Sequence, residues 1–282
     1  MKRVLLFLLS EMMILFPALS GLPNRFDTAS EGLHALSKAE EATLPVQYDG
    51  ISEGDDAPVS LKIGTYNIHN GQRVAYDYAV LASDILTVGL DVCGLQEVDQ
   101  NTLRNGGRDT MKLLSEATGC QYYAFAKAIE FDGGEYGTAI LSKYPIVSFE
   151  TVLLESGRYE QRAYGHAVLL VNGTTVDVYN THFCYQDAWQ RGRQFAAIAE
   201  ELAGKTRWVL TGDFNARDYS EYACIADSLL VNNEENKMIS NHHDYPADNI
   251  VLPSGATVMA SGCYDQATHS DHSMIWADVV LP

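Results

Sequence analysis

An aspartate and an asparagine two residues apart follow a short apolar run in the second half of the chain. Residues 208–210 are apolar, and the next segment, 211–216, contains Asp213 and Asn215. At the end of an extended strand, side chains at positions i and i+2 project from the same face. A carboxylate and an amide would then point together from a strand edge, where open α/β sheets place ligands. Alone, such a pair is more typical of a polar turn.

Other apolar runs in the chain also end in groups that can bind a metal or move a proton. One run ends in Thr65-Tyr-Asn67, a second in Gln96-Glu97 and a third in Asn180-Thr-His182. Asp248 and the tetrapeptide His269-Ser-Asp-His272 follow near the end of the chain. Core strands seldom end in such groups, so several of them in one chain indicate one shared polar site.

These residue types suit metal-assisted hydrolysis of a phosphate ester. Imidazole titrates nearest neutral pH, so His182 and His272 are the candidate proton-transfer groups. Mg²⁺ prefers oxygen ligands and retains several waters, and Glu97 with Asn67 would supply a carboxylate and an amide. We therefore expect Mg²⁺ as the cofactor, with Mn²⁺ as the alternative.

Six short segments in order along the chain resemble the endonuclease/exonuclease/phosphatase superfamily, which includes pancreatic-type deoxyribonuclease, exonuclease III, sphingomyelinases and inositol-polyphosphate 5-phosphatases. They are Thr65-Tyr-Asn-Ile68, Leu95-Gln-Glu-Val98, Gly137-Thr-Ala-Ile-Leu-Ser142, Asn180-Thr-His182, Gly212-Asp-Phe-Asn215 and Ser270-Asp-His272. The resemblance covers about residues 61–281. It implies an α/β fold, a four-layer α/β/β/α sandwich of two packed mixed sheets with the site at one end.

The resemblance also assigns metal ligands. Glu97 matches the principal metal ligand of the family and Asn67 the asparagine beside the metal. Asp271 matches the aspartate that lies near the metal and the attacking water.

The catalytic assignments follow from the same resemblance. Asp213 and Asn215 match the pair that positions water and the scissile phosphate, and His182 matches the histidine that contacts phosphate or assists the leaving group. His272 matches the histidine that polarises water or contacts the phosphate, and Asp248 the carboxylate that orients it. An aromatic residue commonly follows this aspartate in the family, whereas Asn249 follows it here, so the frame of that strand is open.

Four further residues are candidates for substrate binding. Arg104-Asn-Gly-Gly-Arg108 follows Glu97, and its glycines allow close backbone approach while Arg104 and Arg108 could each fork onto phosphate oxygens. A solvated turn is the competing interpretation of this loop. Arg162 is a similar candidate, and Tyr136 could stack on the substrate.

The elements that must position these groups can be read from periodicity. Strands are expected at residues 61–68, 91–96, 122–126, 138–141, 146–154, 163–171, 174–181 and 208–210, with two or three more in the tail, ending with 273–280. Helices are expected at 76–88, 109–118 and 190–202, and Asn172-Gly173 is typical of a two-residue hairpin turn. Helices interspersed with hairpins predict mixed sheets.

The amino end resembles a secretory signal peptide over residues 1–20, with a basic start, an apolar middle and small residues before Gly21. Glu11 interrupts the apolar middle, which leaves an uncleaved membrane anchor and a cytosolic amphipathic segment as alternatives. Residues 21–60 are polar and acidic and are expected to be a linker or pro-segment. The endonuclease/exonuclease/phosphatase domain would then occupy residues 61–282.

The charge of the chain bears on its substrate. The formal net charge is −18, and residues 61–282 contain 28 acidic against 15 basic residues. A protein that grips long polyanions usually has a basic stripe, so duplex DNA is a disfavoured partner. Carboxylates that hold cations reduce the force of this argument.

The sequence thus predicts a secreted or surface-tethered, Mg²⁺-dependent phosphoesterase that hydrolyses a small or lipid-linked phosphodiester. It would be a monomer on the extracytoplasmic side, with the membrane tether at its amino end as the alternative to secretion. One alternative function is an extracellular DNase. Another is a catalytically silent module that binds phosphorylated ligands, although every catalytic position is filled by a competent residue.

Overall fold

The computed structural model describes residues 57–241, 245–265 and 268–282. The predicted signal peptide or anchor at residues 1–20, and the linker or pro-segment up to residue 56, lie outside the described residues. The first strand begins at Val59, two residues before the predicted domain boundary. Within the described ranges, no helix has the length and apolar character needed to cross a membrane.

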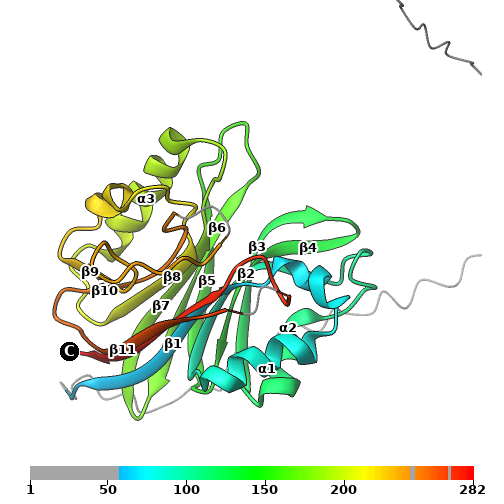
Figure 1. The fold of residues 1–282 in the computed structure, drawn as a ribbon, viewed down its shortest axis with the longest axis horizontal. Helices are drawn as coiled ribbons and strands as arrows, with labels where there is room; N and C mark the ends of the chain where they lie inside the picture. The colour runs from blue at the N-terminus through cyan, green and yellow to red at the C-terminus, as the bar shows by residue number, and fades with distance from the viewer. Residues whose placement is uncertain (1–56, 242–244, 266–267) are drawn as a thin grey trace, which may run out of the picture. The chain divides into compact units, whose positions relative to one another are not determined.

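Twelve strands in the described residues form two six-stranded mixed sheets (Figure 1). The first sheet has the order β11-β12-β1-β2-β4-β3. Its strands are β1 (Val59–Asn67), β2 (Val92–Gln100), β3 (Tyr122–Phe131), β4 (Gly134–Ser142), β11 (Thr257–Tyr264) and β12 (Met274–Leu281). The second sheet has the order β5-β6-β7-β8-β10-β9. Its strands are β5 (Ile146–Leu154), β6 (Arg162–Val171), β7 (Thr174–His182), β8 (Trp208–Asp213), β9 (Ser228–Leu230) and β10 (Asp248–Pro253).

Helices cover the outer faces of both sheets, which confirms the predicted four-layer sandwich. Helices α1 (Tyr78–Val88) and α2 (Thr110–Thr118) pack through Leu81, Ile85 and Leu114 on the first sheet. Helix α3 (Ala188–Leu202) packs through Phe195 and Ile198 on the second sheet, next to the short helix η2 (Tyr219–Cys224). The remaining short helix, η1 (His69–Val74), follows β1.

Local capping explains where the three α-helices begin. The side chains of Asp77, Asp109 and Asp187 accept hydrogen bonds from backbone N–H groups of the first turns of α1, α2 and α3. Helix α1 therefore starts at Tyr78, two residues later than predicted. Gly89 and Gly119 end the first two helices in the left-handed region, as glycine permits.

Two of the strand pairs are hairpins closed by two-residue turns. Asn172 and Gly173 both have positive φ and join β6 to β7, so the predicted two-residue turn is confirmed. A second such turn at Asp132 and Gly133 joins β3 to β4, and both strands run further than predicted. The added part of β3 contains Ile129 and Phe131, the added part of β4 contains Gly134 and Tyr136, and the two extensions pair with each other.

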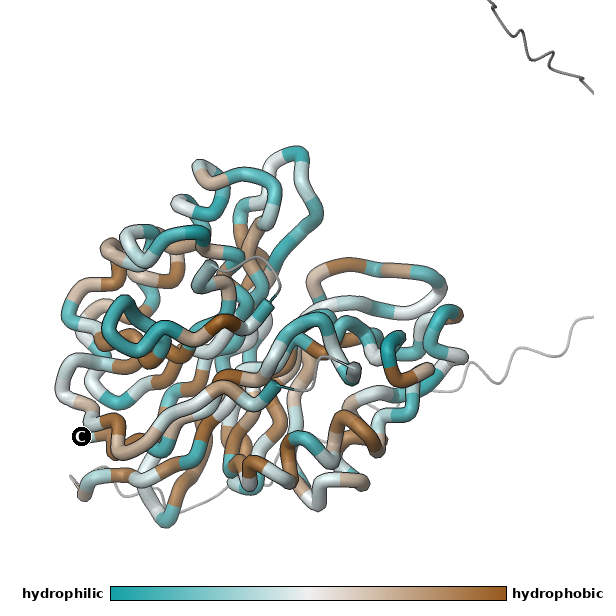
Figure 2. The backbone as a smooth tube through the Cα atoms, viewed as in Figure 1, coloured by the Kyte–Doolittle hydropathy of each residue, from teal (hydrophilic) through white to brown (hydrophobic). Residues whose placement is uncertain are grey.

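The aliphatic core lies between the sheets. Ile63, Ile140, Val178, Val209 and Ile250 belong to one buried cluster contributed by both sheets. Figure 2 shows hydrophobic segments on the strands and on the helices that pack on them, with many hydrophilic segments in the connecting loops. Burial of both inner faces fixes the register of each strand, because a slip by one residue would turn its apolar side chains outward.

Candidate active site

At one end of the sandwich, the inner rows of side chains change from aliphatic to polar. Side chains alternate along a strand, so the polar groups continue the same rows as the core residues. The rows are Leu61, Ile63, Thr65 and Asn67 in β1, Val176, Val178, Asn180 and His182 in β7, and Val209, Thr211 and Asp213 in β8. The polar ends of several strands therefore meet at one edge of both sheets.

Strand register places three predicted site residues side by side. Asp213 in β8 pairs with Asp248 in β10 on one side and with His182 in β7 on the other. Asp213 and Asp248 are buried, and His182 is 6% exposed. The second sheet thus supplies two carboxylates and an imidazole in one row.

A buried polar bridge joins the two sheets directly beneath the site. Gln96 Nε2 donates to Thr65 Oγ1 and, across the sandwich, to Asn180 Oδ1 at 2.6 Å. Asn180 Oδ1 also accepts from Thr211 Oγ1. Gly94 permits this close approach, since a Cβ there would lie 2.1 Å from Thr211 Oγ1. The bridge holds the polar ends of both sheets in one relative position.

Glu97 reaches the site because β2 is interrupted by a β-bulge. Pairing between β2 and β4 shifts between Leu95 and Val98, and Glu97 has a φ of 55°. Bulges re-aim side chains, and a non-glycine residue in the left-handed region is typical of functional sites. Asn215 has a similar φ of 51°, and its amide donates to the backbone oxygen of Phe183.

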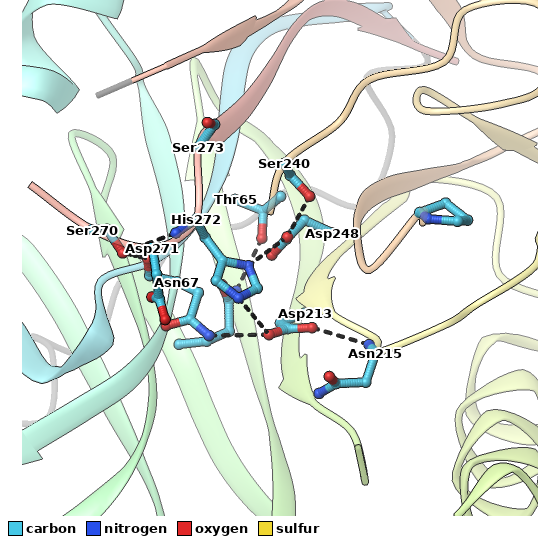
Figure 3. A network of polar contacts seen from close by, with 12 residues as sticks. Thr65, Asn67, Asp213, Asn215, Ser240, Asp248, Ser270, Asp271, His272 and Ser273 are labelled. Atoms are coloured by element: carbon cyan, nitrogen blue, oxygen red, sulfur yellow. Dashed lines mark hydrogen bonds and ion pairs between the residues drawn. The ribbon is translucent and has the colours of Figure 1, made fainter. Parts of the chain in front are cut away.

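Asn67 connects the carboxylates of the two sheets. Its Nδ2 donates to Asp213 Oδ2 at 3.0 Å (Figure 3). The same nitrogen donates to Glu97 Oε1 at 3.0 Å, while Oδ1 accepts from the backbone N–H of His69. In this arrangement Asn67 orients two carboxylates with its amide nitrogen. Its oxygen, the atom that would bind a metal, faces its own backbone.

His272 is oriented by Asp248, as the sequence predicts. His272 Nδ1 lies 2.7 Å from Asp248 Oδ2, which also accepts from Ser240 (Figure 3). Burial lowers the pKa of His272, but the charges of Asp248 and Asp213 outweigh burial and raise it above its ordinary value. Burial, together with the charge of Asp248, raises the pKa of Asp213.

The residue after Asp248 resolves the open question about the strand frame. Asn249 is buried on the other side of β10, where its side chain accepts from the backbone N–H of Asn232 and donates to the backbone oxygen of the same residue. These bonds fix the segment that leads to Ser240. Asn249 therefore has a structural role on one side of β10, and Asp248 points to the other side, toward His272, as predicted.

His182 has a defined tautomer. The guanidinium of Arg162 donates to His182 Nδ1 at 3.1 Å, so the ring proton resides on Nε2, which lies 3.5 Å from Asp213 Oδ2. Burial and the charge of Arg162 hold the pKa of His182 well below its usual value. A neutral imidazole therefore presents an N–H group beside Asp213. Arg162 also pairs with Glu160 at 2.9 Å.

These side chains border an open cleft of about 720 Å³. Its lining includes the predicted site residues Glu97, His182, Asp213, Asn215, Asp271 and His272, while Asn67 and Asp248 lie buried behind them. Residues far apart in the sequence therefore form one site. The cleft edge also includes residues that the sequence did not single out: Glu160, Tyr185, Arg217, Asn241 and Tyr245.

A model of the endonuclease/exonuclease/phosphatase family matches residues 64–272. The chain belongs to this family. Members of the family are hydrolases that act on phosphoester bonds, and they are typically dependent on a divalent metal. A search of curated proteins found no match.

Solved structures of the family share this fold at low sequence identity. An endonuclease/exonuclease/phosphatase family protein of Bacteroides thetaiotaomicron is 18% identical, with 80% of this chain and 96% of that chain covered and a TM-score of 0.62. A mannosyl-6-phosphatase of the same organism is 17% identical, covering 78% and 99% with a TM-score of 0.59. D. rerio TDP2, complexed with a single-strand DNA product, is 18% identical, covering 78% and 98% with a TM-score of 0.59.

The donor set at this family site fits a hard divalent cation. Glu97 and Asp271 present carboxylates to the cleft, and Asp271 Oδ1 is buried without a hydrogen-bond partner among the described residues, with His69 Nδ1 3.3 Å away. Asp213, Asp248 and His272 form a second group whose potential ligand atoms all lie within 4.8 Å of one another. The first group has only oxygen donors, whereas in the second Asp248 Oδ2 and His272 Nδ1 already contact each other at 2.7 Å.

The four predicted substrate-binding residues divide into two pairs. Tyr136 and Arg162 line the cleft. Arg104 and Arg108 do not: Arg104 forms a bidentate ion pair with buried Asp99, and Arg108 donates to the backbone oxygen of Asn105. The expectation that Arg104 reaches the site did not take account of Asp99. This carboxylate lies five residues before Arg104 and binds its guanidinium. Arg217 could have been suspected from the sequence, because it lies only two residues after Asn215.

Proposed function

We propose that this protein is a Mg²⁺-dependent phosphodiesterase that acts on a small or lipid-linked phosphodiester. The observation that carries the proposal is the convergence of Glu97 and Asp271 with Asp213, His182 and His272 on one cleft. Oxygen donors for a cation, two imidazoles and a carboxylate are the groups that in-line hydrolysis of a phosphate ester requires.

Residues at the polar ends of both sheets supply the proton transfers. Asp213 is held by Asn67 at one oxygen and by the backbone N–H of Asn215 at the other, so its carboxylate is oriented to accept a proton from a water in the cleft. His182 Nε2–H is available to donate to a phosphoryl or leaving oxygen. His272, held by Asp248, presents a cationic N–H to the phosphate.

When bound by Glu97 and Asp271, a divalent cation would neutralise the phosphoryl oxygens and stabilise the departing oxygen. Asn67 keeps Glu97 and Asp213 at a fixed separation, and the inter-sheet bridge through Gln96 and Asn180 keeps the two halves of the site aligned. Positioning of this kind contributes a large share of catalysis, because the groups need no rearrangement during reaction.

The charge of the cleft supports a small substrate. Its lining includes four acidic side chains and only two arginines, one of which, Arg162, is already paired with Glu160. A long duplex needs a basic surface along its phosphates, so the DNase alternative has little support from this cleft. The DNA product bound to D. rerio TDP2 is the observation that keeps it in the test. Export or surface tethering remains a proposal from residues 1–20.

The test is hydrolysis of bis(p-nitrophenyl) phosphate, sphingomyelin and plasmid DNA by the full chain, with Mg²⁺ and with EDTA. We expect turnover of the first substrate that EDTA abolishes, and a fall in kcat of about 100-fold or more in Glu97→Gln. Glu200→Gln is the matched control, because Glu200 is an exposed glutamate on α3 outside the cleft. Metal-independent turnover, or equal rates in the two variants, would refute the proposal; preference for plasmid would favour the DNase.

A further inference from the structure

Two residues on the wall of the cleft have no role in the reaction described above. Tyr185 lies just beyond the end of β7, and its side chain is 55% exposed. Arg217 lies just beyond the end of β8 and is also exposed. Both follow strands whose last residues, His182 and Asp213, belong to the reaction centre, so a ligand bound there can reach them.

A buried ion pair holds these two loops from behind. Arg191 on α3 is 1% exposed and grips Glu221 with two hydrogen bonds of 2.8 and 3.1 Å. Arg191 Nη1 also donates to the backbone oxygens of Cys184 and Tyr185, at 3.3 and 3.5 Å. On the other side, Glu221 Oε1 accepts from the backbone N–H of Arg217 at 2.7 Å. One pair therefore fixes the backbones of both cleft residues.

The same pair leaves the charge of Arg217 available. Glu221 is the acidic residue bound to the Arg217 backbone, but both of its oxygens are engaged by Arg191. Within the described ranges, no carboxylate lies within salt-bridge distance of the Arg217 guanidinium, whereas Arg162 across the cleft is paired with Glu160. Burial raises the pKa of Tyr245, a second tyrosine of the cleft lining, and the charges of Arg217 and Arg191 oppose that rise.

We propose that Tyr185 and Arg217 form a specificity subsite for a ring and a second anionic group on the substrate. The inference rests on the proposed phosphodiesterase function and narrows its substrate to a small phosphodiester that carries another phosphate or carboxylate. An exposed tyrosine ring offers a face for stacking, and an unpaired guanidinium binds anionic oxygens in a bidentate manner. In a cleft of net negative charge, such a cation is a strong means of selecting one charged substrate over another.

The test compares two chromogenic substrates that differ by one phosphate: thymidine 5′-(p-nitrophenyl phosphate) and its 3′-phosphorylated derivative. Both release p-nitrophenol, so only the second anionic group varies. In the wild type we expect kcat/KM to be about tenfold higher for the 3′-phosphorylated substrate, the effect of one charge-assisted contact. Arg217→Gln is expected to reduce this preference to less than about twofold, and Arg217→Lys to keep part of it.

Two further variants separate the components of the subsite. Tyr185→Ala is expected to raise KM for both thymidine substrates about tenfold while preserving the preference between them, because it removes stacking and not charge. Arg207→Gln is the matched control: Arg207 precedes the opposite end of β8 and contacts the backbone of Pro282. It removes one positive charge without touching the cleft, so the preference should not change.

The outcomes distinguish the two proposals. If bis(p-nitrophenyl) phosphate shows no metal-dependent turnover, the proposed function fails and the subsite fails with it. If that turnover is present but the wild type shows no preference for the second phosphate, the subsite alone is refuted. A preference that persists undiminished in Arg217→Gln, or that Arg207→Gln reduces equally, also refutes the subsite.

Discussion

Two loops that follow central strands each contain an arginine, and the two guanidinium groups differ in whether a carboxylate binds them. The loop after β2 contains Arg104, and the loop after β8 contains Arg217. Arg104 is bound by Asp99 through two hydrogen bonds of 2.6 and 2.7 Å and lies over the ring of Phe131. Arg217 has no such partner in the described part of the chain, because Arg191 engages Glu221.

Whether the charge of an arginine is available to a ligand therefore depends on where the fold places the nearest carboxylate. Asp99 lies near the end of β2, five residues before Arg104, and is fully buried, so the guanidinium that pairs with it becomes part of the structure. The carboxylate of Glu221 binds Arg191 on α3, and the nearby Arg217 lines the cleft. The following predictions test this contrast, from the largest expected effect to the smallest.

Breaking the Arg191–Glu221 pair should have the largest effect on stability. Glu221→Ala leaves Arg191 buried and without its carboxylate, and we expect the free energy of unfolding to fall by about 3 kcal/mol or more. Urea unfolding followed by circular dichroism measures the loss, with Glu200→Ala on the exposed face of α3 as the control. A loss below about 1 kcal/mol would mean that the pair does not hold the two loops.

Removing Arg104 should weaken the fold but not substrate selection. Arg104→Ala leaves fully buried Asp99 with only the hydroxyl of Thr102, and we expect a loss of about 2 kcal/mol in unfolding free energy. The preference between the two thymidine substrates should change far less than in Arg217→Gln. An equal change in both variants would erase the contrast between the loops and restore Arg104 as a substrate-gripping residue.

A titrating ion cluster outside the cleft should show a smaller, pH-dependent effect. His166 contacts Asp177 at 2.6 Å and Glu150 at 3.0 Å. Burial lowers the pKa of His166, but these hydrogen bonds outweigh burial and the net shift is upward. The folded state therefore binds the proton more tightly, so this stabilisation is present below the unfolded pKa of about 6.5 and is lost as pH rises through the folded value.

We expect the stability difference between wild type and His166→Gln to be no more than about 1 kcal/mol near pH 6, since both partners are partly exposed, and to shrink by pH 8.5. Urea unfolding at several pH values measures it. A difference that grows with pH has the wrong sign and would contradict the account. The effect is smaller than that of Glu221→Ala, because solvent screens the charges of Glu150 and Asp177, whereas Arg191 is buried.

Much of the fold and the reaction centre could be predicted because the signals are local. The apolar rows of β1, β7 and β8 end in polar residues that share the face of the core, so alternation alone sends Asn67, His182 and Asp213 to one end. The order of the six segments indicated the family, and the family model and the shared fold confirm it. The catalytic and metal roles of the individual residues remain predictions.

The parts that could not be predicted depend on which distant groups meet. Nothing near Glu97 in the sequence reveals the bulge that aims it, since the bulge arises from the register of β4 against β2. The carboxylate of Glu221 could pair with the guanidinium of Arg217 or of Arg191, and the packing of α3 on the second sheet places Arg191 beside it. Short-range composition marks each of these residues as charged but does not say which of them stays available.

The reactive groups, and the strand or loop that carries each of them, follow from the order of residues along the chain. Their partners follow from the fold: Asn67 with Asp213, Asp248 with His272, and Arg191 with Glu221. The physical reason is range. A hydrogen bond needs its donor and acceptor about 3 Å apart, and the segments that supply the two atoms are brought within that distance by the packing of the two sheets and their helices.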